Sequence, residues 1–251
     1  MRRAFIRIGL VRTLLELALV VTVVLLLAHR ARPSAHGWQG NPVCSVPTRE
    51  KVVALTYDDG PHPTFTPQIL DVLDRYHVKA TFFMIGQRME SFPDLVEEVA
   101  KRGHAIGNHT YTHPRNLEKS TPSQVIQELE KCEEVIERLT GHRAKLFRPP
   151  RGMLDGTVLT ISSEEGYRTI LWSVCADHHD APTPQDMAAR VLRRVHPGSI
   201  ILAHDGTFPS RIRDVEATSL IIAGLQKRGY RFVTVPELLE LGQKEAEPKR
   251  D

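Results

Sequence analysis

The feature that most constrains this chain is an alternation, after residue 50, between short β-rich runs and amphipathic helical segments. Strands separated by helices are joined by crossover connections and therefore lie parallel, in a barrel or an open wound sheet. In both architectures the chemistry gathers at the carboxyl ends of the strands. The expected strands are 52–57, 80–85, 104–108, 145–148, 168–174, 199–203 and 231–235, and the expected helices are 66–76, 93–102, 121–140, 184–195, 213–228 and a short helix from Pro236.

Residues 1–31 are predicted to form a cytoplasmic stub and a signal-anchor helix that crosses the membrane. The segment from Leu14 to Ala28 is apolar apart from Glu16 and Thr22. Together with the apolar residues before it, it makes a segment of about 20 residues, enough to span a bilayer. Arginines ahead of it favour a cytoplasmic N-terminus. The following residues lack a clean small-x-small cleavage site, which favours a retained anchor over a cleaved signal peptide.

The remainder is expected to lie outside the cell, held at the cell membrane by the anchor, or secreted if the anchor is cleaved. It divides into a Pro-, Gly- and Ser-rich linker at 32–49, a catalytic domain at 50–243 and a charged tail at 244–251. Residues 1–32 hold six arginines against one glutamate, so the rest is slightly acidic although the whole chain carries +3. This balance argues against a nucleic-acid partner. Three cysteines without C-x-x-C spacing indicate neither a zinc–thiolate site nor a disulfide framework.

Two adjacent carboxylates, Asp58 and Asp59, end the first expected strand and precede a Gly60-Pro61 turn. Neighbouring strand residues point to opposite faces, but at the strand end both side chains can reach one cavity. Two buried carboxylates this close resist joint ionisation, and a bound cation would relieve them. Asp-Asp-Gly-Pro is also ordinary turn chemistry, so the pair alone fits a surface turn and an active site equally well.

Two histidines, His109 and His113, follow the third expected strand. Their i, i+4 spacing would place both imidazoles on one side of a helical turn. Two histidines and one carboxylate form a three-ligand site with open positions, which is the pattern of a catalytic zinc or similar divalent ion. The alternative is a pair of surface histidines beside a proline turn. The acidic pair at another strand end of the same alternation favours the metal site.

Four motifs, in this order, resemble the polysaccharide deacetylases of carbohydrate esterase family 4, which include chitin, chitooligosaccharide and peptidoglycan N-acetylglucosamine deacetylases. The resemblance spans residues 51–241 and implies an α/β fold, a distorted (β/α) barrel of about seven parallel strands. The motifs are Thr56-Tyr57-Asp58-Asp59-Gly60, His109-Thr110-Tyr111-Thr112-His113-Pro114, Arg148-Pro149-Pro150 and Leu202-Ala203-His204.

The resemblance implies a role for each motif. Asp58 would be the general base and Arg148 the residue that holds it. His204 would be the general acid, and Leu202 the apolar wall near the acetyl methyl group. The implied metal ligands are Asp59, His109 and His113, and Tyr111 between the histidines is a further candidate for substrate binding.

These roles match what amide hydrolysis requires. A divalent metal, with zinc expected first and cobalt, manganese or nickel as alternatives, polarises the carbonyl and lowers the pKa of bound water towards ~7. A carboxylate beside an arginine stays ionised and can take the proton of water. A histidine can protonate the departing amine near neutral pH.

The chain departs from the family pattern in two places. Arg151 stands where the family usually has tyrosine, and we expect it to contact an anionic group of the substrate. After the fifth strand the usual Asp-x-x-Asp-Trp is replaced by Cys175-Ala176-Asp177-His178-His179-Asp180. Asp177 is the first candidate, and Asp180 the second, for the carboxylate that tunes His204.

The function expected from the sequence is a metal-dependent hydrolase that removes N-acetyl groups from amino sugars of an extracellular polysaccharide or oligosaccharide, peptidoglycan or chitin-like. Two alternatives stay open. The altered positions fit a glycan-binding module that kept the barrel and lost turnover. A related amidohydrolase acting on a small, non-sugar amide would use the same residues.

Overall fold

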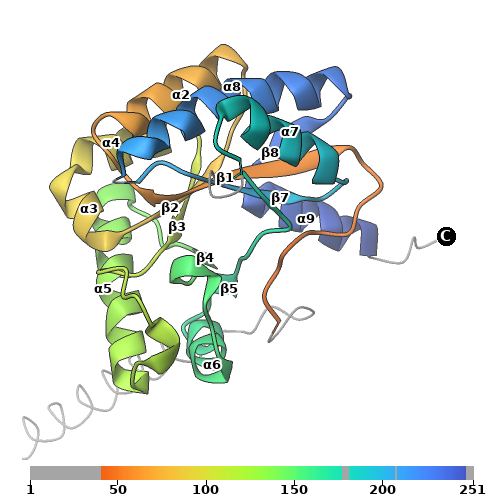
Figure 1. Ribbon diagram of the computed structural model, residues 1–251. Helices are drawn as coiled ribbons and strands as arrows, with labels where there is room; N and C mark the ends of the chain where they lie inside the picture. Colours follow the sequence, from red (N-terminus) through yellow and green to blue (C-terminus); the bar gives the residue numbers. More distant parts are fainter. Residues whose placement is uncertain (1–40, 177–180, 207, 247–251) are drawn as a thin grey trace, which may run out of the picture. The chain divides into compact units, whose positions relative to one another are not determined.

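The computed structural model describes residues 41–176, 181–206 and 208–246 of the chain. Its centre is β1 (Val52–Gly60), which lies within an eight-stranded sheet of order β5-β4-β3-β2-β1-β7-β6, with β8 also paired to β1. All pairings between these strands are parallel, as the alternation predicts (Figure 1). The other strands are β2 (Thr81–Met84), β3 (Ala105–Asn108), β4 (Leu146–Phe147), β5 (Arg168–Thr169), β6 (Val174–Cys175), β7 (Ile200–His204) and β8 (Arg231–Val233).

The sheet is curled into a half-barrel. Its two edge strands, β5 and β6, are separated in the chain by residues 170–173 only. Because so short a connection cannot cross a flat sheet of this width, the two edges must approach each other. This arrangement agrees with the distorted barrel that the resemblance implies. The predicted strand at 168–174 is present as two short strands, β5 and β6, and a buried arginine described below bonds the segment between them.

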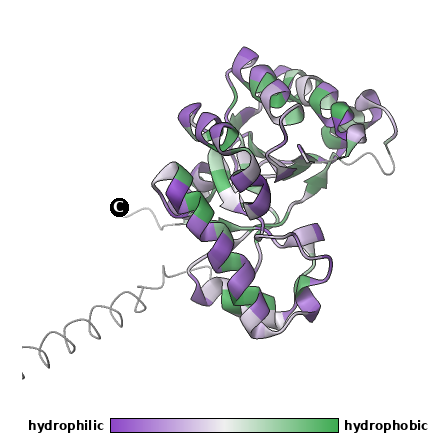
Figure 2. Ribbon diagram, turned by 90° about the vertical axis from the view of Figure 1, so that its left-hand side faces the viewer, coloured by the Kyte–Doolittle hydropathy of each residue, from purple (hydrophilic) through white to green (hydrophobic). Residues whose placement is uncertain are grey.

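α2 and α8 pack against one face of the sheet and α9 against the other. The helical ribbons carry hydrophilic and hydrophobic residues together, as amphipathic helices do (Figure 2). The predicted helices are present within one or two residues of their expected ends, and α5 begins with a capping box between Thr121 and Gln124. Two helices, α3 and α6, were not predicted from the sequence. The helices are α2 (Phe65–Arg75), α3 (Gly86–Ser91), α4 (Pro93–Lys101), α5 (Pro122–Thr140), α6 (Gly156–Glu164), α7 (Pro184–Arg194), α8 (Ile212–Lys227) and α9 (Val235–Ala246), with short 3-10 turns at Leu117–Lys119, Pro150–Gly152 and Pro209–Arg211.

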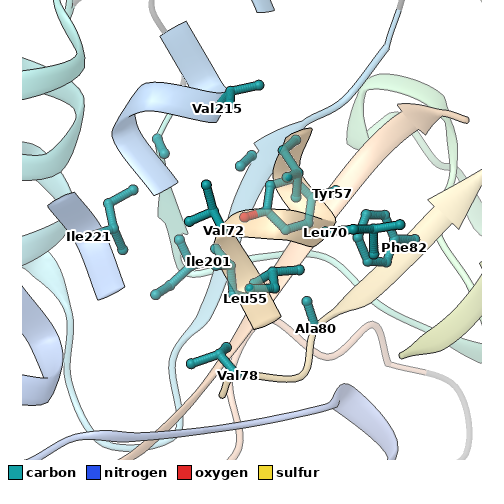
Figure 3. Close-up of a cluster of buried hydrophobic side chains, with 14 of the residues drawn as sticks. Leu55, Tyr57, Leu70, Val72, Val78, Ala80, Phe82, Ile201, Val215 and Ile221 are labelled. Carbon is teal, nitrogen blue, oxygen red and sulfur yellow. The ribbon is translucent and has the colours of Figure 1, made fainter. Parts of the chain in front are cut away.

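The main hydrophobic core lies between the sheet and its covering helices. Leu55 and Tyr57 of β1 pack there with Leu70 of α2 and Ile221 of α8 (Figure 3). Alternate residues of β1 face the other way, where Val52 and Ala54 join a second core with Phe83, Ile200 and residues of α9. This inner face is apolar at the amino ends of the strands and becomes polar towards their carboxyl ends.

Part of the predicted linker packs against the domain. Val43 and Val46 are buried, and Val43 forms a parallel bridge to Ile170 while Ser45 forms an antiparallel bridge to Ser199. These residues connect the end of β5 to the start of β7. The packed part of the chain thus begins before residue 50.

None of the helices within residues 41–246 that the structure describes is long and apolar enough to cross a membrane. The predicted signal-anchor at 1–31 and residues 247–251 of the predicted tail lie outside the described residues. The three cysteines, Cys44, Cys132 and Cys175, are all free.

His104, just before β3, makes the stability of the fold depend on pH. The ring is 6% exposed, and its Nδ1 accepts the Ala80 N–H at 3.1 Å. Burial, with the charges of Lys79 and Arg102, lowers the pKa of His104 from 6.5 to about 4. Because the folded pKa is depressed, the stabilisation is complete above pH 6.5 and is lost as the pH falls towards 4.

We therefore expect this group to account for about 2–3 kcal/mol of the free energy of unfolding lost between pH 7 and pH 4. His104→Asn keeps an acceptor for the same N–H and does not titrate, so urea unfolding of this variant should depend less on pH. The exposed His142 provides the matched control, His142→Asn. Parallel pH profiles for wild type and His104→Asn would contradict the assignment.

Candidate active site

The carboxyl end of β1 contains a bulge that turns two neighbouring carboxylates towards one site. The register against β2 shifts between Asp58 and Gly60, and Asp59 has a left-handed backbone with φ of 74°. A regular strand would send adjacent side chains to opposite faces, and the bulge redirects Asp59. Both carboxylates face His109, whose Nε2 is 3.4 Å from Asp59 Oδ1 and 3.9 Å from Asp58 Oδ2.

Asp58 is held by a fully buried arginine. Arg148 donates from one terminal nitrogen to Asp58 Oδ1 at 2.6 Å and to Thr56 Oγ1 at 2.8 Å. It also donates to the carbonyl oxygens of Ile170 and Leu171, at 3.2 and 3.0 Å. These two carbonyls are thus bonded to a side chain at the point where the chain leaves its pairing with β4 and passes to β7.

The two histidines converge on Asp59 from a loop, not from a helical turn. Thr110 and His113 have positive φ angles of 66° and 56°, and the segment after β3 is irregular. The predicted helical turn is therefore wrong, because the backbone turns through left-handed residues. The expected convergence nevertheless occurs, since the Nε2 atoms of His109 and His113 lie 3.4 and 3.3 Å from Asp59 Oδ1.

The tautomer of His109 suits metal binding. Its Nδ1 lies 2.7 Å from the Arg148 carbonyl oxygen, which can only accept, so Nδ1 carries the hydrogen. Nε2 is therefore the ring nitrogen that faces Asp59 and that would bind a metal once it has lost its proton. Burial alone would lower the pKa of His109, but Asp58 and Asp59 raise it above its usual value. Burial alone would raise the pKa of Asp59, but His109, His204 and His113 lower it well below its usual range.

The spacing of these donor atoms fits a divalent ion. Asp59, His109 and His113 each offer one ligand atom, all within 4.8 Å of one another. Nitrogen and oxygen ligands about 2.0–2.2 Å from a tetrahedral zinc lie about 3.3–3.5 Å apart, which matches the two distances to Asp59 Oδ1. In the part of the chain that the structure describes, this is the one such cluster of three histidine, cysteine or acidic residues.

His204 lies on the strand next to β1. It ends β7 and lies in register with Asp58 on the adjacent strand, as Leu202 does with Thr56. Residues two apart on a strand share a face, so Leu202 and His204 line the same wall. Leu202 is buried and His204 half-buried.

Close packing explains two glycines at the junction of β1 and β7. A Cβ on Gly60 would overlap the carboxylate of Asp205, and one on Gly206 would overlap Asp59. Asp205 is fully buried and accepts the Thr66 hydroxyl at 2.6 Å. Burial, with the nearby charges of Asp59 and Asp58, raises the pKa of Asp205 to about 7.

Comparison with known proteins agrees with this geometry. Residues 45–170 match the model of the polysaccharide deacetylase family. The chain is 42% identical over 196 residues to a peptidoglycan-N-acetylglucosamine deacetylase of Bacillus cereus, an alignment that covers 77% of this chain and 91% of that protein. The chain belongs to the polysaccharide deacetylase family. It is accordingly a deacetylase, an enzyme class that hydrolyses amides.

Solved structures of polysaccharide deacetylases show the same fold. A peptidoglycan N-acetylglucosamine deacetylase in complex with 4-naphthalen-1-yl-N-oxidanyl-benzamide superposes with a TM-score of 0.75 at 39% identity, covering 78% of this chain and 91% of that chain. A family pseudoenzyme from Bacillus anthracis also gives a TM-score of 0.75, at 29% identity, covering 81% of this chain and 70% of that chain. The fold therefore accommodates both active and inactive sites.

The remaining predicted deacetylase site residues lie in different places. Arg151 is exposed, with φ of 60°. Burial and the charge of His109 lower the pKa of His113, and the charge of Arg151 adds a smaller effect in the same direction. Tyr111 points to the helices instead, where its hydroxyl donates to Glu90 at 2.8 Å. Asp177 and its alternative, Asp180, lie outside the described residues.

Three further residues contact the predicted site residues and were not predicted from their sequence pattern. Thr56 accepts from Arg148, Arg211 lies 3.9 Å from Asp59 Oδ2, and Asp214 accepts the His204 N–H at 3.1 Å. In sequence, Arg211 and Asp214 sit in a charged run at the start of a helix, which is typical of a solvated surface. Only their i, i+3 spacing hinted at a pair.

Proposed function

We propose that this chain is a metal-dependent N-deacetylase acting on amino sugars of an extracellular polysaccharide, with peptidoglycan as the first candidate. The observation that carries the proposal is the convergence of Asp59, His109 and His113 beside an Asp58 held by Arg148. Two relatives named for peptidoglycan N-acetylglucosamine support the choice of polymer. Two histidines and a carboxylate favour zinc, with cobalt, manganese or nickel as alternatives.

When bound, the metal would supply Lewis-acid polarisation of the acetyl carbonyl and an acidified water. Asp58 takes the proton of the attacking water, because Arg148 holds its Oδ1 and leaves Oδ2 on the side of the histidines. His204, on the neighbouring strand, donates a proton to the departing amine nitrogen. Leu202 provides an apolar wall for the acetyl methyl group.

The test is acetate release from peptidoglycan and chitooligosaccharides by protein loaded with zinc. We expect release from at least one of these glycans, its loss after chelation and its return when zinc is added back. No release from either glycan by a protein whose zinc content has been verified would contradict the proposal.

A glycan-binding module without turnover is the second candidate. It is favoured by the altered fourth motif, Cys175 to Asp180, and by the similarity to a family pseudoenzyme. This candidate predicts glycan binding without acetate release, so the same experiment separates the two.

Arg151 is proposed to contact an anionic group of the substrate. It is exposed and lies close enough to His113 for its charge to lower the pKa of that residue. We expect Arg151→Tyr to reduce acetate release from anionic glycans about two- to fivefold relative to neutral ones, as is usual for one exposed charge pair. Arg75→Tyr, at the far end of α2, is the matched control. An unchanged ratio between anionic and neutral glycans would contradict this role.

The location outside the cell is likewise a proposal, supported by the apolar segment within residues 1–31. Protease protection of a tagged full-length chain in membrane vesicles would test the predicted orientation. The proposed arrangement exposes the catalytic domain on the outer side and retains the protein in the membrane fraction after alkaline washing.

A further inference from the structure

A buried arginine lies on the side of Asp59 that faces away from the histidines. Arg211 ends the 3-10 turn Pro209–Arg211 and directly precedes α8. It is 6% exposed. A buried guanidinium is stable only where anionic groups or hydrogen-bond acceptors surround it, so its partners indicate what it does.

Among the residues that the structure describes, Asp59 and Asp214 face this guanidinium with their carboxylates. One terminal nitrogen lies 3.9 Å from Asp59 Oδ2, and the other lies 3.6 Å from Asp214 Oδ2. Asp214 is also buried, and its Oδ1 accepts the backbone N–H of His204 at 3.1 Å. Arg211 thus lies between Asp59, a proposed metal ligand, and Asp214, whose carboxylate accepts the backbone N–H of His204, the proposed acid.

The two oxygens of Asp59 have different surroundings. Oδ1 lies 3.3–3.4 Å from the Nε2 atoms of both histidines, whereas Oδ2 faces the positive charge of Arg211. A charge at one oxygen restricts rotation of the carboxylate and leaves the other oxygen to a cation. Groups that contact metal ligands from behind commonly tune metal affinity.

We propose that Arg211 is a positioning residue that orients the Asp59 carboxylate towards the metal site and, through Asp214, fixes the end of β7 at His204. This inference rests on the proposed metal-dependent function. The competing explanation is that Arg211 only neutralises Asp214. Its loss would then destabilise the fold without changing the metal site.

The test uses the full chain and measures metal binding directly. Zinc affinity is obtained by competition with a chelator, and the cobalt-substituted protein is compared by its visible absorption spectrum. We expect Arg211→Met to weaken zinc binding about 10- to 100-fold and to alter the cobalt spectrum. Arg231→Met, which removes an exposed arginine paired with Glu50, should leave both unchanged.

Arg211→Lys provides a second measurement that does not depend on whether Arg211→Met folds. It keeps the charge but shortens and reshapes the donor group, so we expect a smaller loss of zinc affinity and a changed cobalt spectrum. A folded variant at position 211 with the zinc affinity and cobalt spectrum of the wild type would overturn the inference. A wild-type chain that binds neither metal would instead contradict the proposed function.

Discussion

Replacing Asp58 by asparagine is expected to reduce kcat/KM for acetate release about 10²–10⁴-fold, the usual contribution of a general base. The amide keeps the size of the side chain and can still accept from Arg148, so the local packing should persist. It cannot take a proton from water. Since Asp58 is not one of the three clustered ligand candidates, zinc affinity should change little.

The measurement is steady-state acetate release by zinc-loaded Asp58→Asn and wild type on the same glycan, with zinc content determined for each preparation. Asp94→Asn, an exposed acid in the first turn of α4, is the control and should retain activity. If Asp58→Asn bound zinc normally and released acetate at the wild-type rate, Asp58 would not be the base. If the chain only bound glycans, neither the wild type nor the variant would release acetate.

The second large effect is expected on stability. Arg148→Met would leave Asp58, which is 4% exposed, without its cationic partner. It would also leave the carbonyl oxygens of Ile170 and Leu171 without the hydrogen bonds from Arg148, which connect the end of β4 to the segment between β5 and β6. Removing one partner of a buried ion pair commonly costs about 3–5 kcal/mol, and we expect a loss of this size in urea unfolding.

The double variant Asp58→Asn with Arg148→Met separates the ion pair from the other contacts. Because it no longer buries an uncompensated carboxylate, it should be more stable than Arg148→Met alone, by about 1–3 kcal/mol. Recovery should be partial, since Thr56 and the two carbonyls still lack their donor. Unfolding should be measured with a chelator present, so that metal binding does not contribute. Additive losses in the two single variants would show that the pair is not coupled.

Much of the architecture could be predicted because each strand and helix carries a local pattern. The strands before the site end in polar residues, and parallel strands bring their carboxyl ends to one edge. Asp58, Asp59, His109, His113, Arg148 and His204 were identified in this way and through the family motifs. α3 was missed because it is only six residues long, and α6 because its sequence contains glycine and β-branched residues and lacks a clear apolar face.

The details of the site depended on contacts between segments distant in the chain. The i, i+4 spacing of His109 and His113 suggested a helical turn, but tertiary packing selected left-handed residues instead. Tyr111 lay between them in sequence, yet its side chain bonds to Glu90 of α3. Arg211 read as a surface charge, since nothing local indicates that the turn before α8 folds inward beside Asp59.

The sequence by itself determined that the strands run parallel, which chemical groups lie at their ends and which family the chain belongs to, because these follow from local periodicity and from short motifs. Only the tertiary structure decided how the groups are aimed. The bulge at Asp59 turns two adjacent carboxylates to one side. Arg148 donates hydrogen bonds to two backbone carbonyls between β5 and β6. Both depend on the surroundings of a buried charge, which must find its partners wherever the fold places them.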